Sequence, residues 1–247
     1  MNDVPSVLMV GVGGLGTACA WLLASKLPCS LTIVDDDRVH PSNLHRQVLY
    51  SDADVGEKKI DVASRVLERL ASESDIHFEI NAVDGRVNPE NVRSLLRGHD
   101  LVIEGTDNLP TKFLLADAAR LENIPCVSAG CVRWYGWALF SASDGPCLRC
   151  LFEDIPFDRV QGCSEAGVVG PLVGLFGALQ AKLVLDYFSG GNVRGQRWAY
   201  DARTNEPPRS TALRPRAGCA LCEGEITAIV PSRYQPMAAT EVLLNTH

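Results

Sequence analysis

The chain has 247 residues, a formal net charge of −7 and 46% hydrophobic residues. This length suits a single α/β domain with a sizeable core, and the acidic balance argues against nucleic acid or an anionic membrane as the main partner. The start of the chain lacks the basic cluster of a signal peptide. The most apolar stretch, residues 166–181, is too short to span a bilayer. The sequence therefore predicts a soluble, cytoplasmic protein.

The expected elements alternate between strands and helices along the chain. Short apolar runs predict buried strands at residues 6–10, 31–34 and 101–103, and an alternating pattern predicts a strand at residues 78–83. Further strands are expected at residues 126–127 and 137–141. The spacing of apolar residues predicts helices at residues 15–27, 60–70, 89–96 (with Asn88 as the N-cap), 111–121 and 165–188. Residues 152–162 are expected to form a loop across the active-site face, and residues 198–228 short strands. This alternation is typical of a doubly wound α/β fold, whose ligands bind at the carboxyl ends of parallel strands.

A glycine-rich loop, GVGGLG, joins the first strand to the first helix, and its glycines are Gly11, Gly13, Gly14 and Gly16. Small residues let the backbone approach a phosphate, and the helix N-terminus supplies free N–H groups. Asp35, at the end of the second strand, can accept hydrogen bonds from ribose hydroxyls. The same pattern matches the dinucleotide fingerprint, so an NAD-dependent oxidoreductase is an alternative. A tight turn that needs glycine and binds nothing is another.

Polar and basic side chains follow the second strand, and an acidic turn follows the strand at residues 101–103. Guanidinium and ammonium groups are the expected partners of triphosphate oxygens and of the charge that develops at the α-phosphate. Asp107 is a candidate ligand of Mg²⁺. A surface salt bridge for Arg46 and a solvated helix lysine for Lys59 are the alternatives. The candidate binding residues in these segments are Asp37, Asn43, Arg46, Gln47, Lys59, Asp107 and Asn108.

Four of the nine cysteines form two Cys-x-x-Cys pairs, Cys147 with Cys150 and Cys219 with Cys222. Two such pairs, far apart in sequence, have the spacing of a structural tetrahedral Zn²⁺ site, and a redox dithiol is the alternative. Cys163 precedes the expected long helix, where a helix N-terminus would favour the thiolate. It is therefore a candidate catalytic residue, with a small loop residue as the alternative.

Taken together, these motifs resemble the ThiF/MoeB group of ubiquitin-activating-enzyme-like adenylyltransferases. The resemblance rests on GVGGLG (11–16), DDD (35–37), SNLHRQ (42–47), Lys59, GTDN (105–108), the paired cysteines and CSEAGVVGPLVG (163–174), and it extends from about residue 6 to about residue 223. It implies ATP-dependent adenylation of the C-terminal glycine of a ThiS- or MoaD-type sulfur carrier, with release of pyrophosphate, for thiamine or molybdopterin-type cofactor synthesis. It also implies a homodimer, contacts of Gly14, Asn43, Arg46 and Lys59 with the phosphates, Asp35 on the ribose, and Mg²⁺ on Asp107.

The expected fold is a doubly wound, mostly parallel Rossmann-like sheet with a C-terminal antiparallel extension and a zinc knuckle. Residues 1–145 would form the nucleotide-binding core. Residues 146–247 would form the crossover loop, the long buried helix and the zinc-stapled strands of the same domain.

Two departures from the group are visible. Residues 1–5 contain no arginine, whereas relatives carry one in an N-terminal helix that reaches the neighbouring subunit's ATP site. We therefore expect another arginine in its place or a specialised, slower member. There is also no C-terminal sulfurtransferase domain, so sulfur would come from a separate donor, such as a cysteine desulfurase or a sulfurtransferase. Adenylation of another peptide or small carboxylate is an alternative, and so is a non-catalytic subunit that scaffolds a carrier.

Overall fold

The computed structural model describes residues 4–155 and 167–235. Within these residues the chain forms one eight-stranded sheet in the order β3-β2-β1-β4-β5-β6-β7-β8. The first five strands are mutually parallel, and β6, β7 and β8 extend the sheet in antiparallel fashion. The strands are β1 (Ser6–Val10), β2 (Cys29–Asp35), β3 (Phe78–Asp84), β4 (Leu101–Glu104), β5 (Cys126–Val132), β6 (Tyr135–Ser141), β7 (Gln196–Asp201) and β8 (Arg209–Ala212).

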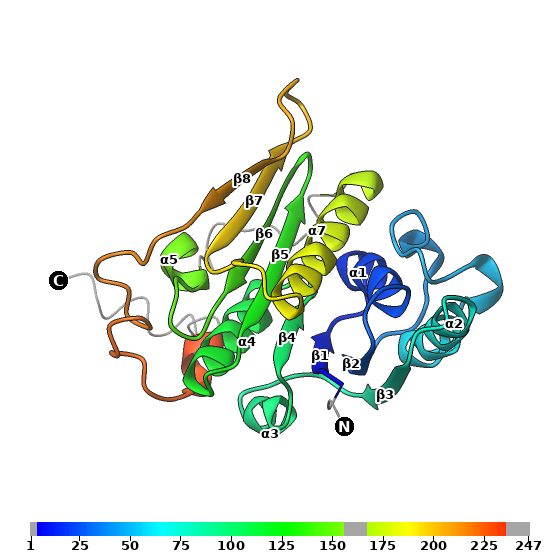
Figure 1. Ribbon diagram of the computed structural model, residues 1–247, viewed down its shortest axis with the longest axis horizontal. Coiled ribbons are helices and arrows are strands. Elements are labelled where there is room, and N and C mark those ends of the chain that lie inside the picture. Colours follow the sequence, from blue (N-terminus) through cyan, green and yellow to red (C-terminus); the bar gives the residue numbers. More distant parts are fainter. Residues whose placement is uncertain (1–3, 156–166, 236–247) are drawn as a thin grey trace, which may run out of the picture.

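Helices cover both faces of the sheet (Figure 1). One face carries α1, α2 and α7, and the other carries α3, α4 and α5. Each group of helices contributes buried apolar residues to its own main cluster against the sheet. The α-helices are α1 (Gly14–Ala24), α2 (Lys59–Glu73), α3 (Val92–Leu96), α4 (Leu109–Leu121), α5 (Leu148–Phe152) and α7 (Gly170–Phe188). Short 3-10 turns are η1 (Pro41–Asn43), η2 (Asp52–Asp54) and η3 (Pro231–Tyr234). The doubly wound, mostly parallel fold with an antiparallel extension is confirmed.

Several predicted boundaries differ from those in the structure. The helix expected from residue 89 begins at Val92, because the Asn88 side chain accepts the N–H groups of Glu90 and Asn91 and closes a turn first. The long helix expected from residue 165 begins at Gly170. Gly167 has a φ of +73°, and the next residue forms a β-bridge with the β5–β6 turn, so helical geometry cannot start earlier within the described residues. Helix α5 was not predicted.

Helix α7 has 19 residues and a mean hydropathy of 1.2, so it is long and apolar enough to cross a membrane. The length argument made from residues 166–181 is therefore wrong. Its packing is that of a core helix: it lies against α1, and the residues on its buried side contribute to the main apolar cluster (Figure 1). A Cβ on Gly177 would lie 2.5 Å from the Leu15 carbonyl oxygen, so the glycine permits the close approach of the two helices.

The parallel strands end together at one edge of the sheet. Strand β1 lies between β2 and β4. The chain runs from β1 through β2 to β3 and then crosses back to β4 on the other side of β1, which makes this edge a topological switch point. The glycine loop, the aspartate triplet 35–37 and the turn 105–108 follow these three strands. The fold thus brings the segments that the sequence singled out to one place.

Candidate functional site

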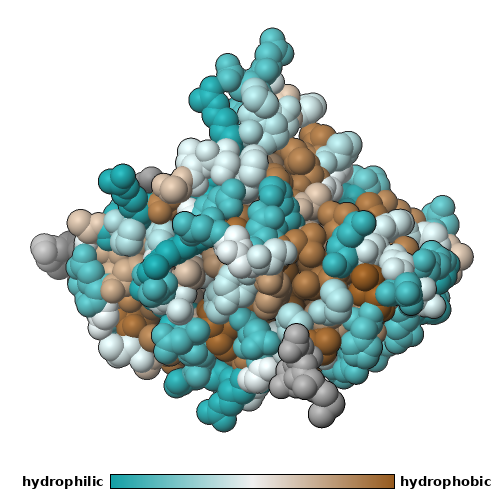
Figure 2. Space-filling view, viewed as in Figure 1, coloured by the Kyte–Doolittle hydropathy of each residue, from teal (hydrophilic) through white to brown (hydrophobic). Residues whose placement is uncertain are grey.

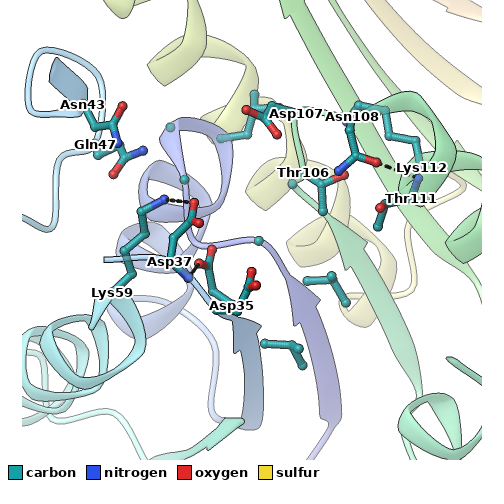
Figure 3. A pocket seen from close by; sticks show the side chains of 18 of the residues that line it. Asp35, Asp37, Asn43, Gln47, Lys59, Thr106, Asp107, Asn108, Thr111 and Lys112 are labelled. Atoms are coloured by element: carbon teal, nitrogen blue, oxygen red, sulfur yellow. Dashed lines mark hydrogen bonds and ion pairs between the residues drawn. The ribbon is translucent and has the colours of Figure 1, made fainter. Parts of the chain in front are cut away.

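A pocket of about 460 Å³ opens at the carboxyl ends of β1, β2 and β4 (Figure 3). Gly16 does not line it, and Cys163 lies outside the described residues. All the other residues expected to bind nucleotide line the pocket, namely Gly11, Gly13, Gly14, Asp35, Asp37, Asn43, Arg46, Gln47, Lys59, Asp107 and Asn108.

Two of the loop glycines are needed for close packing and do not leave open space for a ligand. Gly11 has a φ of +89°, and a Cβ there would lie 2.9 Å from the carbonyl carbon of Gly105. A Cβ on Gly16 would lie only 2.0 Å from the Gly11 carbonyl oxygen. These glycines let the β1 loop, the start of α1 and the end of β4 approach one another closely.

Gly13 faces the pocket instead. A Cβ there would meet no atom closer than Gln47 Nε2, at 3.7 Å. Gly13 is the N-cap residue of α1, and no side chain caps the helix there. Gln47 is 3% exposed, and its Oε1 has no hydrogen-bond partner among the described residues. Uncapped N–H groups beside an open cradle suit an anionic ligand, and the unpaired Gln47 oxygen indicates a missing donor.

Asp35 is fixed in place by the backbone. Its carboxylate accepts the N–H of Val12 at 2.9 Å and that of Asp37 at 2.8 Å. Burial raises the pKa of Asp35 above the usual value, and the nearby ammonium of Lys59 opposes this shift. The side chain is thus oriented at the end of β2, on the opposite side of the glycine loop from the β4 turn (Figure 3).

The two candidate cations come from different elements. Lys59, the first residue of α2, is 4% exposed, and its Nζ donates to Asp37 Oδ2 at 2.7 Å. Arg46, in the segment after η1, donates from one nitrogen to Asn43 Oδ1 at 2.9 Å and from the other to the Ser42 carbonyl at 3.2 Å. The surroundings preorient both cations at one side of the pocket, which suits phosphate oxygens.

The turn after β4 supplies a carboxylate. Asn108 is the N-cap residue of α4, where its side chain accepts the Thr111 N–H at 2.8 Å. Asp107, one residue earlier, is exposed and lines the pocket. Within residues 4–155 and 167–235 its carboxylate has no hydrogen bond or ion pair, so its oxygens are open to a cation.

Sequence reasoning missed a buried ion pair beside this turn. Glu104 ends β4 with 0% exposure, and Lys112 of α4 donates to both of its oxygens, at 2.8 and 3.0 Å. Lys112 also lines the pocket. A carboxylate that closes an apolar strand, followed by a lysine within the next helix, was the available signal.

The four paired cysteines come together away from the pocket, where α5 meets the segment around Cys219. The sulfur atoms of Cys147 and Cys150 are 3.9 Å apart, and three distances between the two pairs are 3.5–3.6 Å. All four sulfur atoms lie within 4.8 Å of one another. Ligands about 2.3 Å from a tetrahedral zinc ion would be separated by about 3.8 Å. The cluster is therefore consistent with a closed zinc site, and none of its members lines the pocket.

A comparison with models of known protein families shows to which family the chain belongs. The model of the ThiF family matches residues 3–221, which is most of the chain. The chain belongs to the ThiF family. The matched residues include every segment that lines the pocket, from the glycine loop to the turn after β4 and the start of α7.

Two curated relatives of this ThiF-family chain show its place among related proteins. It is 37% identical over 234 residues to the SAMP-activating enzyme E1 of Haloferax volcanii, covering 92% of this chain and 84% of that protein. It is 35% identical over 224 residues to the adenylyltransferase and sulfurtransferase MOCS3 of Drosophila sechellia, covering 89% of this chain and 49% of that protein. The chain therefore spans about half the length of the MOCS3 relative.

Among solved structures, the ThiF-family fold matches that of MccB from E. coli in complex with MccA-N7isoASN. The TM-score is 0.75 at 18% sequence identity, and the match covers 88% of this chain and 67% of that one. The same enzyme with ATP gives a TM-score of 0.72 at 19% identity, over 88% and 66% of the two chains. At these identities the likeness concerns the fold alone.

Proposed function

We propose that this chain is an ATP-dependent adenylyltransferase that activates the C-terminal glycine carboxylate of a ubiquitin-like sulfur carrier of the ThiS or MoaD type. One observation carries the proposal. An uncapped phosphate-binding loop, two preoriented cations and an unpaired carboxylate converge on one pocket, in a chain 37% identical to a SAMP-activating enzyme. This set serves phosphoryl chemistry, whereas a hydride transfer gives Arg46 and Lys59 no role.

The residues divide the work between binding and charge stabilisation. The Gly13–Gly14 backbone binds phosphate oxygens, and the Asp35 carboxylate accepts hydrogen bonds from the ribose hydroxyls. Gln47 and Asn43 make the remaining contacts with the nucleotide. The carrier's carboxylate oxygen attacks the α-phosphorus of ATP, a new P–O bond forms, and the bond to the β-phosphate bridging oxygen breaks.

Pyrophosphate leaves with the electron pair of the broken bond. Arg46 and Lys59 stabilise the charge that accumulates on the phosphate oxygens. Asp107, with Asn108 beside it, would hold Mg²⁺, which neutralises further charge when it is bound. The acyl-adenylate that results is the activated product.

The four-cysteine cluster would hold a structural Zn²⁺ ion. Four thiolates fill a tetrahedral coordination sphere, so the ion would have no open position for substrate. Its role would be to tie α5 to the segment around Cys219.

A sulfur donor would act after adenylation. The MOCS3 relatives are named as both adenylyltransferases and sulfurtransferases. We infer that a cysteine desulfurase or sulfurtransferase delivers the sulfur, and that the acyl group passes from the adenylate to this donor through Cys163, with AMP as the leaving group. The product would enter thiamine or molybdopterin-type cofactor synthesis.

A homodimer is the expected assembly. Hydrophobic residues gather over α1 and α7 on the face shown in Figure 2, and Trp21 of α1 is 40% exposed. A contiguous apolar surface of this kind is typical of an interface. Light scattering on the purified protein would reveal the dimer, and Trp21→Glu is expected to weaken it.

The proposal is tested by ATP–pyrophosphate exchange with Mg²⁺, in the presence and absence of a ThiS- or MoaD-type carrier ending in Gly-Gly. Exchange is expected only with the carrier, and Arg46→Ala or Asp107→Ala is expected to abolish it. Arg69→Ala is the matched control, because Arg69 lies on the exposed side of α2 and, among the described residues, pairs only with Glu73, at 3.8 Å. If Arg46→Ala and Asp107→Ala both retain full exchange, the assignment is wrong.

Two other results would redirect the proposal. Exchange with a peptide or small acid and none with a carrier would make the substrate a different carboxylate. Thermal protection by NAD and none by ATP would restore the oxidoreductase alternative.

A further inference from the structure

The buried ion pair of Glu104 and Lys112, at the end of β4, is not explained by a gain in the stability of the fold. The side chains of Glu104 and Lys112 are 0% and 5% exposed, so both charges have lost most of their hydration. Replacement of such a pair by apolar residues of similar volume is often neutral or even stabilising. The pair is therefore better explained by the geometry that it imposes on its surroundings.

The carboxylate of Glu104 holds the residue that precedes Asp107. Both the backbone N–H and the side-chain hydroxyl of Thr106 donate to Glu104 Oε1, each at 2.7 Å. On the other side of the turn, Gly105 packs so closely that a Cβ would lie 3.0 Å from the Gly11 carbonyl oxygen. The turn is thus fixed from two directions.

Lys112 ties this arrangement to the neighbouring strand. The β4–β5 ladder ends where Glu104 pairs with Ser128, which leaves the next carbonyl group, that of Ala129, beyond the ladder. Lys112 Nζ donates to that carbonyl at 2.6 Å as well as to Glu104. The amide of Gln180, on α7, donates to the Glu104 carbonyl at 2.8 Å. Strands β4 and β5 and helices α4 and α7 all contribute to the position of one carboxylate.

We propose that Glu104, Lys112 and Thr106 form a positioning device for Asp107, which holds the β4 turn where the Asp107 carboxylate meets the divalent cation of a metal–nucleotide substrate. Figure 3 shows Thr106, Asp107 and Lys112 together on the β4 side of the pocket, facing the Asp35–Lys59 side. This inference rests on the proposed function, in which Asp107 binds Mg²⁺. Glu104, Lys112 and Thr106 then control the part of the nucleotide affinity that depends on the bound metal.

The first test measures nucleotide binding by calorimetry, with Mg²⁺ and with EDTA. Thr106→Val removes the hydroxyl and keeps the shape, and a Glu104→Gln/Lys112→Met double variant removes both charges together. Both are expected to weaken Mg·ATP binding about tenfold, the loss expected for a hydrogen bond to a charged group, and to leave ATP binding in EDTA unchanged. Thr106→Ser, which keeps the hydroxyl, is expected to recover the Mg²⁺ dependence.

Thr32→Val is the matched control. It removes a threonine hydroxyl that lies 3.0 Å from His99 Nε2, and neither residue lines the pocket. It is expected to leave both affinities unchanged. An equal loss of affinity in Mg²⁺ and in EDTA for Thr106→Val would overturn the inference.

The second test combines Thr106→Val with Asp107→Asn. If Thr106 acts through Asp107, the valine variant has no further effect in the Asp107→Asn background. Independent effects that multiply would show that Thr106 has a general structural role and would overturn the proposal. The proposed function is tested separately by ATP–pyrophosphate exchange in the wild-type protein. The result of that assay does not depend on the binding measurements of the Thr106 and Asp107 variants.

Discussion

The glycine loop offers a sharp prediction because two of its glycines differ in what surrounds them. Gly13→Ala places a methyl group in the pocket, where the nearest atom, Gln47 Nε2, would be 3.7 Å away. Gly16→Ala places a methyl group 2.0 Å from the Gly11 carbonyl oxygen, a backbone atom with little freedom to move. The first variant should fold and lose its ligand, and the second should lose stability.

The magnitudes follow from these contacts. Alanine in place of glycine at an N-cap costs about 0.5–1 kcal/mol, whereas overpacking against the backbone at Gly16 costs about 3 kcal/mol or more. At a ligand concentration of 100 times the dissociation constant, wild-type protein gains about 2.7 kcal/mol of stability from Mg·ATP. If the Gly13→Ala methyl weakens binding by about 100-fold, the gain falls to about 0.4 kcal/mol.

Urea unfolding of the three proteins, with and without Mg·ATP, measures both quantities at once. Gly13→Ala should nearly match the wild type without nucleotide and lose most of the nucleotide-dependent gain. Gly16→Ala should unfold at a much lower urea concentration. Full protection of Gly13→Ala by Mg·ATP would refute the reasoning, since the methyl group would then occupy space that the phosphates do not use.

Four further predictions concern other parts of the molecule. Lys59→Met should keep the fold, because methionine fills the same buried space, and should lower carrier-dependent exchange by at least about 100-fold, measured beside its melting temperature. Cys222→Ser should lose bound zinc in metal analysis and unfold at a lower temperature, and an unchanged melting temperature would remove the structural role of the cluster. Asp117→Ala removes the buried partner of Arg149 and leaves the exposed Asp154 as its other ion-pair partner at 2.8 Å, and should cost about 3 kcal/mol in urea unfolding. Because burial raises the pKa of Asp35, ATP affinity measured on acidification should begin to fall above the usual aspartate range of about pH 4, and Asp35→Asn should lack that titration.

The sheet and the location of the pocket were predictable because their signals are local. The apolar runs at residues 6–10 and 101–103 are strands that only a covered parallel sheet can bury, and the polar turns that follow them must then meet at one edge. The cysteine spacing likewise predicted four sulfur atoms in one cluster. These conclusions need no knowledge of how particular helices dock.

The missed features depend on tertiary packing. Glu104 and Lys112 are eight residues apart, and only the docking of α4 against β4 and β5 brings them together away from water. The loop glycines look alike in sequence, but Gly16 has a packing role because the loop folds the Gly11 carbonyl against it, whereas Gly13 faces open space. Helix α5 has five residues, too few for a periodic signal, and Arg149 within it is held by an aspartate of α4.

The central claim is that the carboxylate of a carrier's terminal glycine becomes joined to AMP. The most direct test is intact-protein mass spectrometry of a Gly-Gly carrier after incubation with this chain, ATP and Mg²⁺, beside the same carrier without its last glycine. The account predicts that the full carrier gains one AMP moiety and that the shortened carrier gains none. An unmodified full carrier, in a sample where the protein binds Mg·ATP, would contradict it.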